Sequence, residues 1–350
     1  IIDTPGIDDT GSLGESRVRQ TRKVLNKADI AVLVMEAASP CATTAEQELL
    51  ALFKAKKIPY IIAWNKSDLA ATAPPFPRPQ NPAAATAPLS AQNEIAISAL
   101  TGEGIPELKE LIARSVRSDE MKHRLIGDMV SAGDFVVLVV PIDSAAPKGR
   151  LILPQQQVIR DVLESDATAV VVKEHELKDT LRDLGKKPRI VITDSQAFEK
   201  VSADTPPDVP LTSFSIIFAR YKGDLAQSAN GVRALDDIKD GDRILICEGC
   251  THHRQCDDIG TVKLPRWIRA HTGAEPKFDF TSGGDFPGGI EGYKLIVHCG
   301  ACMLNEREMK YRLAQAADAE VPMTNYGILI AHVHGILDRA TAPFAAALRS

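Results

Sequence analysis

Residues 58–68 read IPYIIAWNKSD, a short apolar run that ends in a polar tetrad. Such a run, β-branched and bounded by turn residues, is typical of a strand buried in a parallel sheet. The run at 28–37, ADIAVLVMEA, has the same character, and residues 44–57 between the two have the apolar spacing of an amphipathic helix. The succession of strand, helix and strand therefore predicts an α/β fold with parallel strands.

The alternation continues toward the C-terminal side of this first region. Residues 93–99 predict a further strand, and residues 104–116 predict a helix with Pro106 near its first turn. Residues 70–89 are rich in Pro and Ala and have no periodicity, which favours a solvent loop. We expect these elements to form a first domain at residues 1–117.

A second series of strands and helices follows. Apolar runs at 134–143, 167–174 and 188–195 predict strands, and the stretches between them predict helices. This region has no evident catalytic residues, so we interpret 118–208 as an architectural, dimerisation domain. An uncovered edge of its sheet would satisfy its free N–H and C=O groups by pairing two subunits, which predicts a homodimer.

The Pro-rich stretch 205–210 marks the next boundary, and a third α/β domain is expected at 209–350. It contains apolar runs at 242–250, 292–302 and 326–337, which glycine-rich turns separate. The first two of these runs carry cysteine motifs at their ends.

Composition limits the class of protein. The chain has 350 residues, of which 44% are hydrophobic and 25% charged, and this is ordinary globular composition. A net charge of -5 and a pI near 6.0 argue against nucleic-acid and anionic-membrane partners. The apolar runs are too short to span a bilayer. We therefore expect a cytoplasmic protein with neither nucleic acid nor membrane as a partner.

Three motifs in the first domain come in the order and spacing of a GTPase: DTPG at 3–6, NKSD at 65–68 and SAL at 98–100. Asp68 can accept both guanine N–H donors with its two carboxylate oxygens, and adenine lacks that donor pair. Asp3 would hold Mg²⁺ through a water molecule, and the Gly6 amide would face the γ-phosphate. The motifs together predict a guanine-nucleotide site.

The remaining motif residues complete this site. The Lys66 stem would cover one face of the base, Asn65 would brace neighbouring loops, and the Ala99 amide would reach guanine O6. The predicted nucleotide-binding residues are Asp3, Gly6, Asn65, Lys66, Asp68, Ser98 and Ala99.

The phosphate-binding motif G-x-x-x-x-G-K-S/T does not occur in the 350 residues. In a GTPase it would lie several dozen residues before Asp3, so we expect the chain to be truncated at its N-terminus. We also expect the chain to bind GTP poorly or not at all, which leaves GTP hydrolysis by this chain uncertain.

The third domain carries Cys250-x-His252 and His298-Cys299-x-x-Cys302. A Cys-x-x-Cys turn lets two thiolates converge on one metal centre. Tetrahedral zinc bound by three cysteines and a histidine is chemically reasonable, and spacing alone slightly favours it. A 4Fe-4S cluster with three cysteine ligands and an exchangeable fourth site is the alternative.

Three further cysteines fall outside these two motifs. Cys247 ends an apolar run and is expected to be buried as a small hydrophobe. Cys256 lies in a polar stretch and is a weaker candidate ligand, and we assign no role to Cys41.

The combined motifs resemble the HydF family of FeFe-hydrogenase maturation GTPases. The resemblance covers nearly the whole chain and is carried by DTPGIDDTGSLGESRV at the start, CTHHRQCDDIGTVKLPRW at 250–267 and HCGACMLNEREM at 298–309. The chain departs from the family in its missing N-terminus, in the Pro/Ala insertion after Leu69, and in Cys256 close to the first motif.

The resemblance implies a potassium-activated GTPase domain, a dimerisation domain and a cluster domain. It implies a 4Fe-4S cluster on Cys250, Cys299 and Cys302, with a labile fourth site for which His252 is the candidate and His298 the weaker one. The family acts as a scaffold or carrier that receives a diiron precursor from two radical-SAM maturases and passes it to the hydrogenase. GTP hydrolysis, with Mg²⁺, is thought to control partner exchange.

Two other functions were weighed against this one. A zinc-stabilised GTPase of ribosome or tRNA maturation would need a basic surface, and the acidic charge balance argues against it. A redox enzyme that uses the cluster for electron transfer would need a substrate site, and the sequence offers none.

Overall fold

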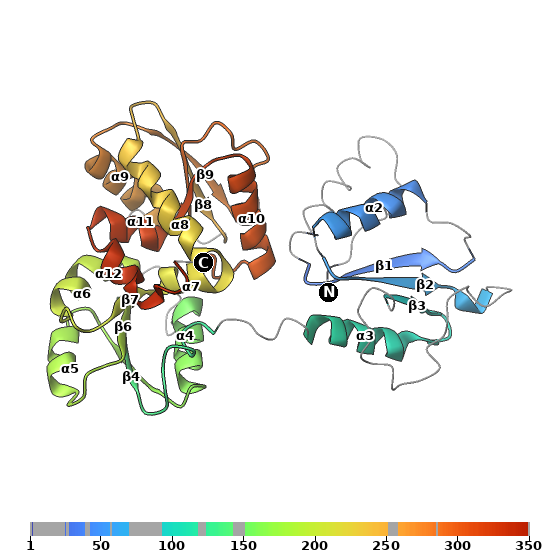
Figure 1. Cartoon of the computed structure of the whole chain (residues 1–350), viewed down its shortest axis with the longest axis horizontal. Helices are drawn as coiled ribbons and strands as arrows, with labels where there is room; N and C mark the ends of the chain where they lie inside the picture. The colour runs from blue at the N-terminus through green and yellow to red at the C-terminus, as the bar shows by residue number, and fades with distance from the viewer. Residues whose placement is uncertain are drawn as a thin grey trace. The chain divides into compact units, whose positions relative to one another are not determined.

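The computed structural model describes residues 2, 25, 28–38, 43–56, 58–69, 93–117, 124–142, 151–250, 258–284 and 286–348. The chain divides into two compact units, residues 1–122 and 123–350. Both units are α/β structures built on parallel sheets (Figure 1), which confirms the predicted fold class.

The first unit contains a three-stranded parallel sheet, in the order β1 (Ala31–Glu36), β2 (Tyr60–Asn65) and β3 (Glu94–Ala96). Its helices are α2 (Thr44–Ala55), the short η1 (Ser67–Leu69) and α3 (Ile105–Arg117). The helices α2 and α3 cover opposite faces of the sheet (Figure 1). Helix α2 begins at a capping box formed by Thr43 and Glu46, and Phe53 near its end packs against Ile58. Because β2 and β3 pair in parallel, their carboxyl ends, where the guanine motifs lie, share one edge of the sheet.

The second unit contains two four-stranded parallel sheets. The strands of the first, in sheet order, are β5 (Thr168–Val172), β4 (Phe135–Val139), β6 (Ile190–Thr193) and β7 (Leu211–Ser213). Its helices are α4 (Leu153–Leu163), α5 (Leu177–Asp183), η3 (Ser195–Ala197), α6 (Phe198–Asp204) and α7 (Phe214–Lys222). In the central strand β4, residues 136–139 are fully buried, as a strand covered by helices on both faces should be.

Strand β7 lies beyond the domain boundary that we expect at residue 208, yet it pairs with β6. The Pro-rich stretch before it is a turn, closed by a bond from the Val209 N–H to the Pro206 carbonyl. The sheet that begins at β4 therefore extends through this stretch.

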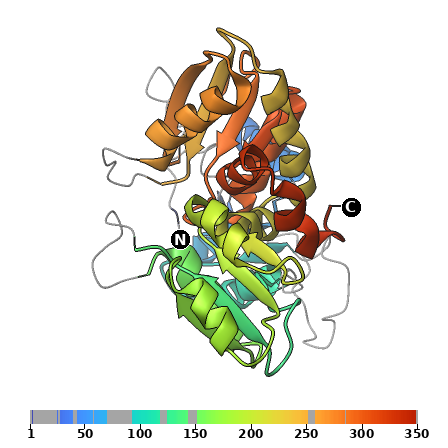
Figure 2. The same cartoon turned by 90° about the vertical axis from the view of Figure 1, so that its left-hand side faces the viewer.

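The second sheet of this unit has the strand order β11 (Met323–Asn325), β10 (Leu295–His298), β8 (Arg243–Glu248) and β9 (Lys277–Ser282). The helices around it are α8 (Leu225–Gly231), η4 (Val232–Asp237), the π-helix η5 (Ile259–Lys263), α9 (Leu264–Thr272), α10 (Glu306–Asp318), α11 (Tyr326–Val333), α12 (Leu337–Thr341) and η6 (Ala342–Phe344). Strands β8 and β10 are neighbours at the centre of this parallel sheet, so their carboxyl ends share one edge. Figure 2 shows the two sheets of this unit, the first mainly green and the second mainly orange.

The two sheets of the second unit share one hydrophobic core and meet through the N-terminal ends of α7 and α11. The Asn325 side chain caps α11 and also donates to the Ser215 carbonyl at 2.8 Å. The Gly327 N–H donates to Ser215 Oγ at 3.2 Å, and a Cβ at Gly327 would lie 2.7 Å from Ser215 Cβ. The close approach of the two helices requires glycine at this position.

Of the helices in the ranges given above, none combines the length and the apolar character needed to cross a membrane.

Candidate functional site

The guanine motifs lie together in the first unit. Asn65 is the last residue of β2, Lys66 follows it in a left-handed conformation with φ of 62°, and Asp68 is in η1. Asn65 Oδ1 accepts a hydrogen bond from the Ala99 N–H at 3.0 Å, which joins the loop after β2 to the loop after β3. This amide is the same donor that we predict to reach guanine O6.

Buried and charged contacts fix the two loops. Ser98 is fully buried, and its Oγ accepts from the Thr101 N–H at 3.1 Å. The Lys66 ammonium donates to Glu36 Oε1 at 2.8 Å, and this hydrogen bond raises the pKa of Lys66. The two motif segments are therefore adjacent at the carboxyl edge of the sheet, where ligands bind in open α/β folds. Asp3 and Gly6 lie outside the described residues.

The cysteine motifs follow the two central strands of the last sheet. Cys247 is opposite His298 in the parallel register of β8 and β10, and the Cys299 N–H donates to the Cys247 carbonyl at 2.9 Å. Cys250 is two residues beyond β8, and Cys302 lies in the turn after β10. The strand ends thus bring the two motifs to one place, while His252, Cys256 and Cys41 lie outside the described residues.

The Cys299 thiol is the best defined of the three candidate ligands. Its Sγ accepts hydrogen bonds from the Gly249 N–H at 3.1 Å and from the Ala301 N–H at 3.4 Å. Burial raises the pKa of Cys299 to about 12, and nearby Cys250 and Cys302 also raise it. A bound cation would reverse this preference for the thiol form.

The backbone around these cysteines is tight. Ala301 has φ of 54°, which turns the chain between Cys299 and Cys302. A Cβ at Gly249 would lie 2.8 Å from Leu304 Cγ and 3.6 Å from Cys299 Sγ. Glycine at 249 thus lets the loop after β8 approach the turn after β10.

Lys222, the last residue of α7, holds the same turn from the neighbouring sheet. Its ammonium donates to the carbonyls of Ala301, Cys302 and Leu304 at 3.2, 2.9 and 2.7 Å. Burial lowers the pKa of Lys222, and the nearby cysteines oppose that shift. No local sequence pattern connects a lysine to a turn about 80 residues away.

His298 is buried and has partners at both ring nitrogens. Nδ1 lies 2.9 Å from the Cys299 carbonyl and Nε2 lies 2.9 Å from Arg312 Nη1. Since arginine only donates and a carbonyl only accepts, the ring carries its proton on Nδ1 and accepts at Nε2. Burial, together with the Arg312 charge, lowers the pKa of His298 to about 3. In this arrangement the ring has no lone pair free for a metal.

Arg312 extends this buried network. It is fully buried and forms an ion pair with Glu308, at 2.9 Å between Nε and Oε1. Its guanidinium also donates to the Gly283 carbonyl at 3.2 Å and lies over the Phe286 ring. The network fixes His298, and with it the start of the cysteine turn.

A second buried acid lies at the end of β8. Glu248 is 3% exposed and accepts from the Tyr326 hydroxyl at 3.4 Å. Burial and the Glu248 charge raise the pKa of Tyr326 well above its usual range. A Cβ at Gly260 would lie 2.5 Å from Glu248 Oε1, so the chain passes close to this pair. Glu248 was not predicted, because one acidic residue between two cysteines gives no signal of burial.

Cys247 is fully buried, as expected for a small hydrophobe, and burial raises its pKa to about 11.

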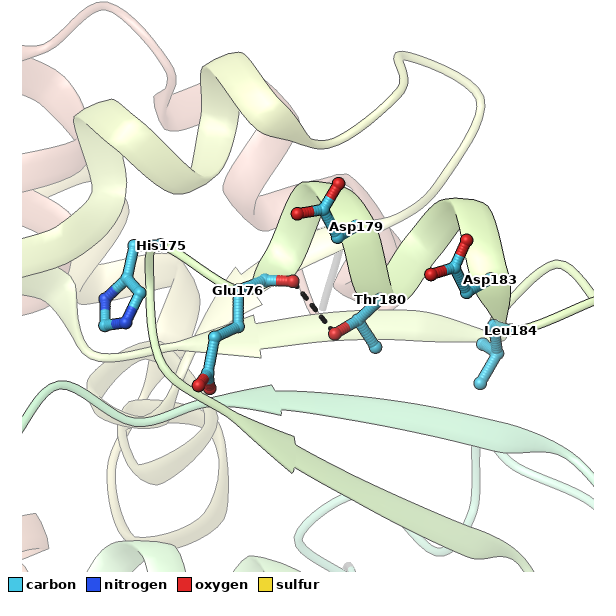
Figure 3. Close-up of a pocket in the computed structure, with 6 residues that line it drawn as sticks. All are labelled: His175, Glu176, Asp179, Thr180, Asp183 and Leu184. Carbon is cyan, nitrogen blue, oxygen red and sulfur yellow. Dashed lines mark hydrogen bonds between the residues drawn. The ribbon is translucent and has the colours of Figure 1, made fainter.

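A surface hollow lies along α5, lined by His175, Glu176, Asp179, Thr180, Asp183 and Leu184 (Figure 3). Arg182 forms ion pairs with both aspartates on the same helix. The Glu176 carboxylate accepts from the Lys173 N–H at the start of the turn. The acidic groups therefore serve the helix itself and do not converge on a ligand.

The geometry defines a class of protein that has GTPase-like motifs on one parallel sheet and a group of cysteines at the carboxyl edge of another. Comparison with known families specifies this class further. Residues 125–223 match the hydrogen maturase F dimerization domain, and residues 226–343 match the hydrogen maturase F tetramerization domain. The chain belongs to the hydrogen maturase F family.

One curated protein with a similar sequence is the tRNA modification GTPase MnmE of Heliobacterium modesticaldum. It is 36% identical over 121 residues, which are 34% of this chain and 24% of that protein. The chain thus spans about a quarter of the length of this relative. The similarity agrees with a GTPase-type first unit.

Proposed function

We propose that this protein is a scaffold and carrier in hydrogenase maturation, which holds a 4Fe-4S cluster on Cys250, Cys299 and Cys302. The observation that carries the proposal is the meeting of the two cysteine motifs at the ends of β8 and β10, with two backbone N–H donors on Cys299 Sγ. Hydrogen bonds of this kind to a ligand sulfur are a means by which proteins tune a cluster.

The chain's own residues have distinct tasks in this proposal. Gly249 and Ala301 supply N–H donors, Lys222 holds the turn, and the ion pair of Arg312 with Glu308 fixes His298 as a structural residue. His252 is proposed as the fourth, exchangeable ligand. When bound, the cluster would supply one iron whose weak ligand an incoming diiron complex can replace.

The guanine motifs of the first unit are proposed to recognise GTP, with Mg²⁺ and K⁺ as in the family, although we expect weak binding by these 350 residues because they contain no G-x-x-x-x-G-K-S/T motif. Support comes from the adjacency of Asn65, Asp68 and Ala99 at one sheet edge. The test is calorimetric titration of the chain with GDP and with ADP. Preference for GDP, lost in Asp68→Ala, would support the proposal, and equal affinity for both nucleotides would contradict it.

Assembly is proposed to begin as a homodimer through the region 125–223, with further pairing through 226–343, because the matching family models carry those names. In the first of these regions β5 is an edge strand, and its Val171 is 45% exposed. Light scattering of the full chain should give a dimer or tetramer. Val171→Lys should lower the assembly state if β5 forms the contact, and an unchanged state would exclude that edge.

The proposed partners are the catalytic subunit of the hydrogenase and the radical-SAM maturases that make its diiron precursor, which is cargo here. A role in RNA maturation, suggested by the name of the MnmE relative, is less well supported. Both family models that match belong to hydrogen maturase F, and the net charge is -5.

The deciding experiment is iron and sulfide analysis of anaerobically purified protein, with a visible spectrum and an in vitro hydrogenase activation assay. Cys250→Ala, Cys299→Ala and Cys302→Ala should each lose the cluster and the activation, whereas Cys247→Ala and Cys256→Ala should retain iron. His252→Ala should retain a cluster with an altered paramagnetic-resonance signal. Colourless protein with one zinc per chain on the cysteines would overturn the proposal.

A further inference from the structure

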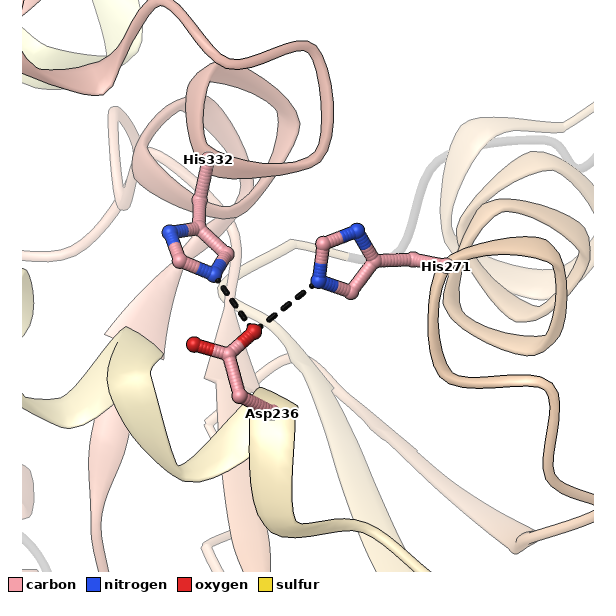
Figure 4. A group of neighbouring side chains, drawn as sticks. All are labelled: Asp236, His271 and His332. Carbon is pink, nitrogen blue, oxygen red and sulfur yellow. Dashed lines mark hydrogen bonds and ion pairs between the residues drawn. The ribbon is translucent and has the colours of Figure 1, made fainter.

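A second group of metal-ligand side chains lies on the last sheet's helical layer, separate from the cysteines. Asp236, His271 and His332 come from η4, α9 and α11, and they converge on one point (Figure 4). Asp236 Oδ1 lies 3.0 Å from His271 Nε2 and 2.9 Å from His332 Nε2. Within the described ranges, only these three potential ligand atoms all lie within 4.8 Å of one another.

We propose that Asp236, His271 and His332 form a second metal site, which takes a zinc-like divalent cation. Two imidazoles and one carboxylate suit zinc and its transition-metal neighbours, whereas magnesium and calcium prefer all-oxygen ligands. Ligand atoms around tetrahedral zinc lie about 3.3 Å apart, given bond lengths near 2.0–2.1 Å. The two N···O distances therefore need to lengthen by only a few tenths of an ångström to admit the ion.

The site is held by rigid elements and is open to solvent. The helices that carry the two histidines are anchored by buried apolar residues, among them Ile268 in α9 and Leu329 in α11. The side chains of Asp236, His271 and His332 are 52%, 26% and 19% exposed, so a cation can enter and a water molecule can complete its coordination. Three protein ligands with one open position are the usual composition of an open zinc site.

Electrostatics at this point favour a cation. Both histidines lie in the last turn of their helices, where the helix dipole is negative. The hydrogen bonds from His271 and His332 lower the pKa of Asp236, which keeps the carboxylate charged. An ion here would fix η4, α9 and α11 to one another, which would stabilise the last sheet's helical layer.

The test uses Co²⁺ as a spectroscopic probe of the full chain, because the cysteines can also bind metal. Cobalt on thiolates gives intense charge-transfer bands, whereas cobalt on imidazole and carboxylate gives only weak visible bands. The weak bands should appear with wild-type protein, should be lost in His271→Ala and His332→Ala, and should persist in the surface control His175→Ala. Equal far-UV circular dichroism of all variants without metal shows that each is folded.

The second measurement is the thermal midpoint with Zn²⁺. A hundredfold excess of Zn²⁺ over its Kd should raise the midpoint of His175→Ala by about 5–10 °C, and EDTA should reverse the rise. Asp236→Asn, which keeps the shape of the side chain, should reduce the shift to the part that zinc on the cysteines contributes, and Mg²⁺ should give none. Equal weak cobalt bands and equal zinc shifts in all variants would show that the three residues form only a hydrogen-bonded contact, and would overturn the proposal.

Discussion

Replacing Lys222 with methionine should loosen the cysteine turn while leaving the rest of the second unit intact. The methionine keeps most of the apolar stem, which in the lysine places its ammonium over the Phe218 ring. It removes the charged donor from three carbonyls, at 3.2, 2.9 and 2.7 Å. The turn would keep its bond from the Leu304 N–H to the Ala301 carbonyl, at 3.1 Å.

The magnitude follows from the three bonds. Hydrogen bonds to charged groups contribute about 1.5–3 kcal/mol each, but these three share one ammonium that is only partly buried. We therefore expect a total of about 2–4 kcal/mol rather than the sum of three full bonds. Since about 1.4 kcal/mol corresponds to a factor of ten, the local opening of the turn should become about 30 to 1,000 times more frequent.

Hydrogen–deuterium exchange of the peptide that contains residues 299–304 measures this opening directly. The matched control is Lys187→Met, because Lys187 forms one exposed ion pair with Asp208, and such pairs contribute little to stability. The same two variants, loaded with iron and sulfide, should differ in how fast they release iron to a chelator. If Lys222→Met showed the same hydrogen–deuterium exchange rate and the same iron-release rate as Lys187→Met, the hydrogen bonds from Lys222 would not stabilise the turn.

Three further substitutions test the surroundings of the site. Gly249→Ala should lower iron content and cost about 1–3 kcal/mol, because its Cβ would lie 2.8 Å from Leu304 Cγ; iron analysis and thermal melting measure both. Arg312→Leu should cost about 3–5 kcal/mol in denaturant unfolding by leaving the buried Glu308 charge unpaired, and adding Glu308→Leu should recover much of that loss. Gly327→Ala should cost about 1–3 kcal/mol by separating α7 from α11, and a melting temperature equal to wild type would contradict this.

The sequence predicted those parts of the fold whose signal is local. The strands that end at residues 65, 248 and 298 lie within the apolar runs identified in the sequence, and Cys299 and Cys302 directly follow the last of them. Parallel pairing of β8 and β10 then brings the two cysteine motifs together, because the carboxyl ends of parallel strands share one edge.

Other features depended on contacts between distant segments. The apolar run at 326–337 contains the helix α11. This helix is apolar on nearly all sides because it is buried between layers, and hydrophobic periodicity does not distinguish such a helix from a buried strand. Strand β9 (Lys277–Ser282) alternates polar and aromatic residues and was not predicted. No local sequence pattern predicts the contacts made by Lys222, by Arg312 or by Asp236 with its two histidines. Each of these contacts depends on tertiary packing.

The cysteine turn is built by both sheets of the second unit, and this has a consequence for the proposed carrier. A Cβ at Gly300 would lie 3.5 Å from Ser215 Oγ, and Lys222 at the other end of α7 holds the carbonyls of the same turn. Helix α7 lies in the region that matches the dimerization domain, whereas the turn lies in the region that matches the tetramerization domain. A shift of α7 would change all three carbonyl contacts together, because one ammonium makes them all. We therefore expect changes at the subunit contact to alter how firmly the thiols are held, which would couple the assembly state to the release of cargo.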